Sequence, residues 1–171
     1  MALYYATRYP DHPAKLILAS TSVQPIGERS YSMFESLGGR AARAAAVEFW
    51  TNPKKDTAKK YNHLCLPLYN QRRLPDGFYS RAIRNTEMRL VFIERELAAG
   101  GIRERFGRIV CPTLVMAGEK DPITPVEDAQ EIVAALPPSL AQFERLENAG
   151  HHLFWDQPTF FFDRVRRFMV S

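Results

Sequence analysis

Two short apolar runs in the last third of the chain each end in a turn that carries an ionisable residue. Residues 113–117 are followed by a turn with Asp121, and residues 141–146 by a turn with His151. Short apolar runs bounded by turn residues are typical of buried strands in a parallel sheet. Because parallel strands end at the same edge, we expect the carboxylate and the imidazole to lie close together.

This pair of residue types suits acid–base chemistry. A carboxylate next to an imidazole fixes the tautomer of the ring and stabilises its protonated form. Each residue also has a simpler explanation, since aspartate favours turns for its own backbone hydrogen bonds and histidine is common in surface loops. The occurrence of both turns favours the acid–base interpretation for Asp121 and His151.

Composition restricts the class of protein. At 171 residues and 46% hydrophobic, the chain can bury one core of ordinary size, with a small appendage. No apolar run approaches the roughly 20 residues that span a bilayer, and the N-terminus lacks a signal-peptide pattern. We therefore expect a cytoplasmic protein without membrane association.

Cys65 and Cys111 lack the spacing of a metal or redox motif, so we expect free thiols, no metal site and no cofactor.

The net charge is +4, and residues 23–107 contribute 15 Lys/Arg against 9 Asp/Glu. A basic excess can attract nucleic acid. Here the charges recur at helical spacing among apolar residues, which is typical of a solvated helical surface. We therefore expect no nucleic-acid partner.

The order of elements predicts an α/β fold, in which three parallel strands with flanking helices carry an inserted helical cap. We expect a buried helix at 1–9 and a strand at 15–21 that is covered on both faces. Residues 1–22 and 108–171 would form the core, and residues 23–107 the cap over the strand ends. The other helices are expected at 32–49 with a break at Gly38 and Gly39, at 56–69, at 78–99, at 125–136 and at 154–170.

Two motifs give a resemblance to a known family. GEKDPITP at residues 118–125 and NAGHHLFWDQP at residues 148–158 resemble the acid and histidine motifs of the α/β-hydrolase fold, whose triad order is nucleophile, acid, histidine. The opening MALYYATRYPDHPAKLILAST resembles the segment that follows the nucleophile elbow in that family. The cap is similar in type and position, and CLPLY at residues 65–69 is most similar to proline iminopeptidase-like members.

The resemblance implies a hydrolase that cleaves ester or amide bonds of a small molecule or short peptide through an acyl-enzyme. An aminopeptidase of the proline iminopeptidase type is the specific activity that the cap suggests. In the family the catalytic imidazole follows glycine directly, which favours His151 over His152, with Asp121 as its orienting acid. The motif G-x-S-x-G and its Asp and Cys versions are absent from these 171 residues. We therefore expect the C-terminal part of a longer enzyme, without the nucleophile elbow and inactive by itself.

Several alternatives stay open. Ser20 or Ser22 at a strand end is a candidate nucleophile, but neither has the flanking glycines of a sharp elbow turn. Asp128 and Asp156 are weaker candidates for the acid, because each lies in or at the start of an expected helix. Capped dehalogenases and epoxide hydrolases share both motifs and use an Asp nucleophile. A non-catalytic fragment or binding module is the remaining class.

Aromatic and acidic residues of the cap are candidates for lining a substrate pocket. Each of them can also be explained more simply, as part of the cap core or of a solvated helix face. They are Phe49, Trp50, Tyr69, Glu87 and Glu94.

A sheet of this size has an exposed edge. In the family order the strand at 15–21 pairs with 113–117 on one side and has no partner from this chain on the other. We also expect Leu3 and Tyr5 to lack cover. The expected partner is therefore a second copy or a complex with the missing N-terminal half.

Overall fold

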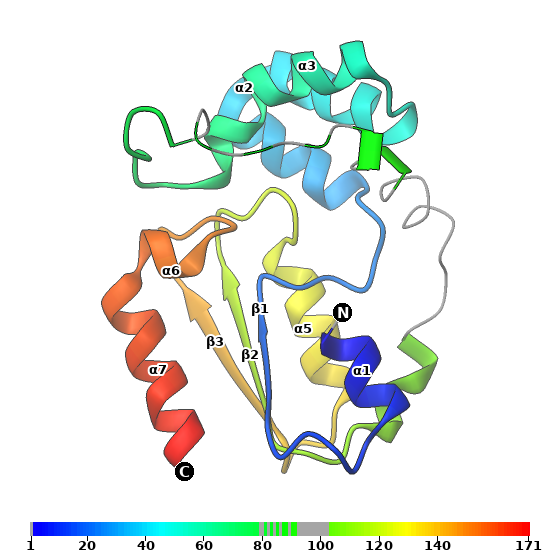
Figure 1. Cartoon of the computed structure of the whole chain (residues 1–171), viewed down its shortest axis with the longest axis vertical. Coiled ribbons are helices and arrows are strands. Elements are labelled where there is room, and N and C mark those ends of the chain that lie inside the picture. The colour runs from blue at the N-terminus through cyan, green and yellow to red at the C-terminus, as the bar shows by residue number, and fades with distance from the viewer. Residues whose placement is uncertain are drawn as a thin grey trace.

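The computed structural model describes residues 2–78, 81, 83, 85, 87, 88, 90, 91 and 103–171. Three parallel strands form one sheet in the order β1–β2–β3. Their bounds are Leu16–Ala19 for β1, Thr113–Gly118 for β2 and Ala141–Leu146 for β3. All three run toward the same edge, so the chain leaves β2 and β3 side by side (Figure 1). The α/β class and the pairing of the first two strands are confirmed.

Helices cover both faces of the sheet (Figure 1). The elements concerned are α1 (Ala2–Arg8), η3 (Arg103–Arg108), α5 (Val126–Ala135), α6 (Leu153–Asp156) and α7 (Pro158–Val170). The side chains of β2 alternate between two hydrophobic clusters: Val115 and Ala117 pack with α1 and α5, and Leu114 and Met116 pack with α7. The expected helix at 154–170 is two helices, because Pro158 begins a new one.

The first strand is less covered than its sequence suggests. Leu16 and Leu18 are buried, whereas Ile17 is half-buried and Ala19 is exposed. The prediction that this strand is covered on both faces holds only in part, because Ile17 packs against the cluster beneath α7 but stays half-buried, and Ala19 is exposed. Among the described residues β1 pairs only with β2, and a strand at the edge of a sheet lacks the neighbours that would cover its second face.

Helix α1 shows a similar difference between its two faces. Leu3 and Ala6 are buried against the sheet, so the prediction that Leu3 lacks cover is wrong. Tyr5 is 45% exposed, as expected, and Tyr4 and Tyr9 are exposed beside it. The helix is therefore half-buried, with an aromatic face on the surface.

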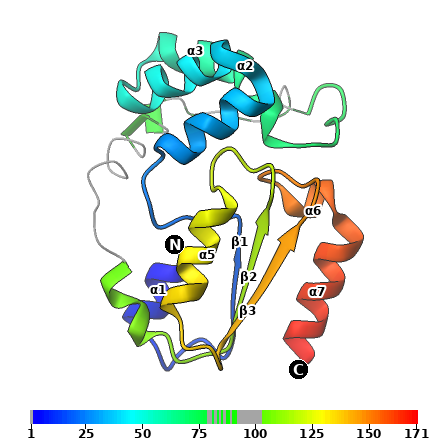
Figure 2. The same cartoon turned by 180° about the vertical axis from the view of Figure 1, so that it is seen from behind.

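A second layer of helices lies across the carboxyl edge of the sheet (Figure 1, Figure 2). It contains α2 (Glu28–Thr51), α3 (Lys55–Leu64) and the 3-10 helix η1 (Leu66–Tyr69). We call this layer the cap, although the division of the chain into two domains stays a prediction. The break in α2 is confirmed at Gly39, whose φ of 74° is left-handed. The expected helix at 78–99 lies largely outside the described residues.

The cap has its own hydrophobic core, in which Phe34, Phe49 and Tyr61 are fully buried. Burial raises the pKa of the Cys65 thiol in this core to about 12. Cys65 and Cys111 are both buried free thiols, as predicted. In the described part of the chain no helix combines the length and apolarity needed to cross a membrane.

Cap and sheet are joined by an ion pair as well as by the chain. The guanidinium of Arg29 in α2 lies 2.9 Å from Oδ1 of Asp128 and 2.7 Å from Oε1 of Glu131, both in α5. Asp128 is buried, so its carboxylate depends on this partner. This contact fixes the start of α2 above the sheet.

The end of β2 offers a test of the packing. A Cβ on Gly118 would lie 2.4 Å from the carbonyl oxygen of Ala149 and 2.5 Å from that of Gly150. Since both neighbours are backbone, we expect Gly118→Ala to lower the free energy of unfolding by about 1–3 kcal/mol. Urea denaturation followed by circular dichroism measures the change.

The matched control is Gly107→Ala, because no heavy atom of the described residues lies within 4 Å of a Cβ built there. We expect this variant to lose no more than about 0.5 kcal/mol. Equal stability of the two variants would contradict the close approach of Gly118 to the backbone of Ala149 and Gly150.

Candidate active site

Asp121 follows β2 in a tight turn, and its side chain is fully buried. Oδ1 accepts hydrogen bonds from the backbone N–H groups of Ile123 at 2.8 Å and Thr124 at 3.0 Å. Oδ2 accepts one from the Thr124 hydroxyl at 2.6 Å. The simpler explanation of Asp121 as a turn residue is thus correct, and the same turn holds the carboxylate in one orientation.

His151 follows β3 and faces this carboxylate. Its Nδ1 lies 3.0 Å from Oδ2 and 3.2 Å from Oδ1 of Asp121, and 24% of its side chain is exposed. With Nδ1–H donating to the carboxylate, Nε2 is the nitrogen that can take up a proton. The predicted proximity of the two side chains is confirmed, while their catalytic roles stay a prediction.

The turn before His151 contains two residues with special backbone requirements. The left-handed residue is Asn148, with φ of 53°, and not the glycine. Gly150 is required for a different reason, because a Cβ there would lie 2.3 Å from the carbonyl oxygen of Tyr69 in the cap. The backbone N–H of His151 donates to that same carbonyl at 2.7 Å. The loop that carries the histidine therefore lies directly against the cap.

Tyr69 is the cap candidate that contacts the site. Its ring meets the His151 ring edge-on, with centroids 5.6 Å apart, and its hydroxyl lies 2.6 Å from that of Tyr61. Phe49 and Trp50 pack in the core of the cap. Glu87 is exposed and pairs with Lys55, while Glu94 lies outside the described residues.

His152 differs from its neighbour in its partners. Its Nδ1–H donates to Oδ1 of Asn70 in the cap at 2.7 Å. Its ring lies 5.4 Å from that of His151, centroid to centroid. His152 therefore packs beside His151 and binds the cap, without a contact to Asp121 among its hydrogen bonds in the described residues.

The weaker candidates have other partners. Asp128 binds Arg29, and the carboxylate of Asp156 accepts hydrogen bonds from backbone N–H groups. Ser20 adopts φ of 48°, and its Oγ is buried without a hydrogen-bond partner among the described residues. The Ser22 hydroxyl is bonded to the backbone of Gln24.

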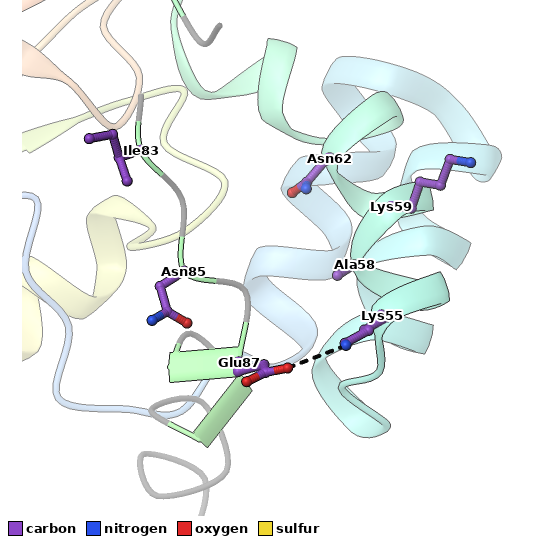
Figure 3. Close-up of a pocket in the computed structure, with 7 residues that line it drawn as sticks. All are labelled: Lys55, Ala58, Lys59, Asn62, Ile83, Asn85 and Glu87. Carbon is purple, nitrogen blue, oxygen red and sulfur yellow. Dashed lines mark hydrogen bonds and ion pairs between the residues drawn. The ribbon is translucent and has the colours of Figure 1, made fainter. Parts of the chain in front are cut away.

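A hollow of about 670 Å³ lies beside α3 (Figure 3). It is lined by Lys55, Ala58, Lys59, Asn62, Ile83, Asn85 and Glu87. Neither Asp121 nor His151 contributes to it, so we do not assign the reaction to it. Within the described ranges, no three His, Cys, Asp or Glu side chains gather in a way that could hold a metal ion.

Solved structures of similar fold match nearly the whole chain. An esterase from Exiguobacterium antarcticum is 19% identical with a TM-score of 0.70, and the match covers 99% of this chain and 62% of the esterase. A monoacylglycerol lipase from Paleococcus ferrophilus is 20% identical with a TM-score of 0.62, covering 99% and 63%. At this identity the likeness shows the fold.

A sequence relative matches a shorter segment. An uncharacterized protein of Mycobacterium tuberculosis is 43% identical over 58 residues, which are 34% of this chain and 16% of the relative. The chain thus spans a small part of that relative and about three fifths of the two solved structures.

The family profile for the alpha/beta hydrolase fold matches residues 1–158. This match includes both turns that carry Asp121 and His151, and it agrees with the parallel sheet and its flanking helices. The chain belongs to the α/β-hydrolase fold family.

Proposed function

We propose that this chain provides the acid and the histidine of a hydrolase that cleaves ester or amide bonds through an acyl-enzyme. The observation that carries the proposal is the 3.0 Å contact between Nδ1 of His151 and Oδ2 of Asp121 at the carboxyl edge of the sheet. Ligands of open α/β sheets bind at this edge.

Each side chain has a defined role in this mechanism. Asp121 keeps the proton on Nδ1 and stabilises the imidazolium that forms during the reaction. Nε2 of His151 takes the proton from the nucleophile during attack and returns it to the leaving group. Because Asp121 is buried and its turn donors hold it in place, little reorganisation is needed when the charge develops.

We propose that the nucleophile comes from a segment other than these 171 residues. The motif G-x-S-x-G does not occur in them, and the outer edge of β1 has no partner strand among the described residues. A further parallel strand on this edge would lie next to β1 and would end at the same carboxyl edge of the sheet as β2 and β3. A longer form of the polypeptide or a separate chain can supply that strand together with the nucleophile.

For the substrate class, an ester is favoured over an amine-bearing peptide. A proline iminopeptidase-like enzyme holds its substrate amine with acidic cap residues. In this cap Glu28 pairs with Arg43, Glu48 with Lys60, and Glu87 with Lys55. The esterase and the lipase among the similar structures also support an ester. The second candidate is a dehalogenase or epoxide hydrolase, in which the missing strand carries an aspartate.

The absence of an elbow motif leads to a kinetic prediction for the purified 171-residue chain. We expect no hydrolysis of p-nitrophenyl esters or aminoacyl p-nitroanilides above background, and no labelling by a fluorophosphonate probe, because the nucleophile is absent. Saturable turnover that is abolished by Ser20→Ala or Ser22→Ala would contradict this account. The coding sequence upstream of Met1 gives a second check: an in-frame G-x-S-x-G supports a serine, and G-x-D supports the second candidate.

The free edge of β1 leads to a prediction about association. Unpaired backbone groups on an edge strand are a template for another chain, and the exposed Tyr4, Tyr5 and Tyr9 add apolar surface nearby. We expect the purified chain to associate at micromolar concentration. Sedimentation velocity measures this, and a monomer with a cooperative melt would be the contrary result.

The two adjacent histidines differ in their response to pH. Burial, together with the neighbouring His151, lowers the pKa of His152 below its ordinary value of 6.5, against an opposite effect of Asp121 and Asp156. The unfolded chain therefore binds more protons than the folded chain between the lowered pKa and about 6.5. In that window the free energy of unfolding rises with pH, so acidification destabilises the fold.

We expect the melting temperature to fall as the pH is lowered from 7.5 to 5.5, and to fall less in His152→Gln. The glutamine amide can still donate to Asn70 but does not titrate in this range. His12→Gln is the matched control, because His12 is exposed and bonded to Tyr5. Equal pH dependence of all three proteins would show that His152 does not contribute.

A further inference from the structure

Four consecutive residues of the cap, 69–72, are hydrogen-bonded to the loop that carries His151 and to α6. The carbonyl of Tyr69 accepts from the N–H of His151, and Asn70 accepts from the His152 ring. The N–H groups of Gln71 and Arg72 donate to the side chain of Asp156. We call residues 69–72 the cap strap.

The carboxylate of Asp156 lies where the strap meets the histidine loop. Oδ1 accepts from the N–H of Gln71 at 3.0 Å and of Arg72 at 2.9 Å. Oδ2 accepts from the N–H of Gly150 at 2.7 Å and again from Gln71 at 3.0 Å. Asp156 is 5% exposed, and this carboxylate joins segments that are more than 80 residues apart in the chain.

Three N–H groups converging on one buried side chain require an acceptor with two oxygens. A carboxylate anion accepts at both oxygens, whereas an amide has one oxygen and replaces the other with a donor. A buried N–H without an acceptor costs free energy, and hydrogen bonds to a charged acceptor are the stronger kind. The chemistry of this position therefore fits aspartate and does not fit asparagine.

We propose that Asp156 is a positioning residue for His151, an inference that rests on the proposed function. Gly150 and His151 are consecutive, and their N–H groups are held by Asp156 and by the strap carbonyl of Tyr69. These two hydrogen bonds fix the backbone that carries the imidazole, and so direct Nδ1 at Asp121. Small displacements of a catalytic group are costly, and a shift of about 1 Å can reduce a rate about a hundredfold.

The same carboxylate couples the cap to the histidine. If the strap moves away from the sheet, it must release the hydrogen bonds of Gln71 and Arg72 to Asp156 and that of the His151 N–H to Tyr69. One oxygen of Asp156 then keeps Gly150 while the backbone of His151 loses its acceptor. The orientation of the histidine therefore depends on the cap being in place.

The test is the tautomer of His151 in the 171-residue chain, read from the ring ¹⁵N chemical shifts of histidine-labelled protein. In the wild type we expect Nδ1 protonated and Nε2 unprotonated when the ring is neutral. In Asp156→Asn we expect a mixture of tautomers, because the amide can serve either Gly150 or Arg72 but not both. We also expect the N–H that loses its acceptor to exchange with solvent roughly tenfold or more faster.

Two control variants separate this proposal from the proposed function. Asp163→Asn changes a carboxylate on α7 whose ion-pair partner is Arg166. This variant should leave the His151 tautomer unchanged. Asp121→Asn should itself abolish the Nδ1–H tautomer. A wild type without that tautomer would contradict the proposed function. A wild-type tautomer retained in folded Asp156→Asn would contradict the positioning role alone.

If Asp156→Asn does not fold, native-state hydrogen exchange of the wild type decides the question. We expect the N–H groups of Gly150, Gln71 and Arg72 to be released in one opening event, with the same dependence on denaturant. Separate opening events for the strap and the histidine loop would overturn the proposal.

Discussion

The parallel pairing of β2 with β3 continues past the ends of both strands, and the geometry of the site depends on it. The N–H of Glu119 donates to the carbonyl of Leu146 at 3.1 Å, and that of Lys120 donates to Ala149 at 2.9 Å. These hydrogen bonds hold the turn of Asp121 beside the loop of His151. The contact between the two side chains is thus determined first by main-chain register, and Gly118 permits it by leaving room for the neighbouring carbonyls.

The cap adds a second constraint from above the sheet. At one point Arg29 binds Asp128 and Glu131 of α5, and at another the cap strap binds the histidine loop through Asp156. Both attachments involve buried carboxylates, whose desolvation is compensated only while their partners stay in place. The cap thus covers the carboxyl edge of the sheet, and through these two attachments it also holds α5 and the histidine loop in place.

Much of this arrangement could be predicted from the sequence, because it follows from local patterns. The continuous apolar run of β2, the turn residues around Asp121 and the break at Gly39 each reflect a preference of the residue itself. The contacts of Asp156 with Gln71 and Arg72 could not be predicted, since these residues are more than 80 positions away and bind through backbone N–H groups that any residue would offer. The burial of Leu3 and the exposure of Ala19 also escaped prediction, because an apolar sequence does not reveal which neighbours are present to cover it.

The two members of the acid–histidine pair differ in how much each depends on the other. Asp121 receives three hydrogen bonds from its own turn, so its carboxylate is satisfied even without an imidazole. His151 has no comparable local support: its backbone is held by the cap, and its ring by Asp121. The acid is therefore built into the fold of the turn, whereas the histidine is oriented only when sheet, loop and cap come together. Any motion that regulates this site would act on the histidine and leave the acid in place.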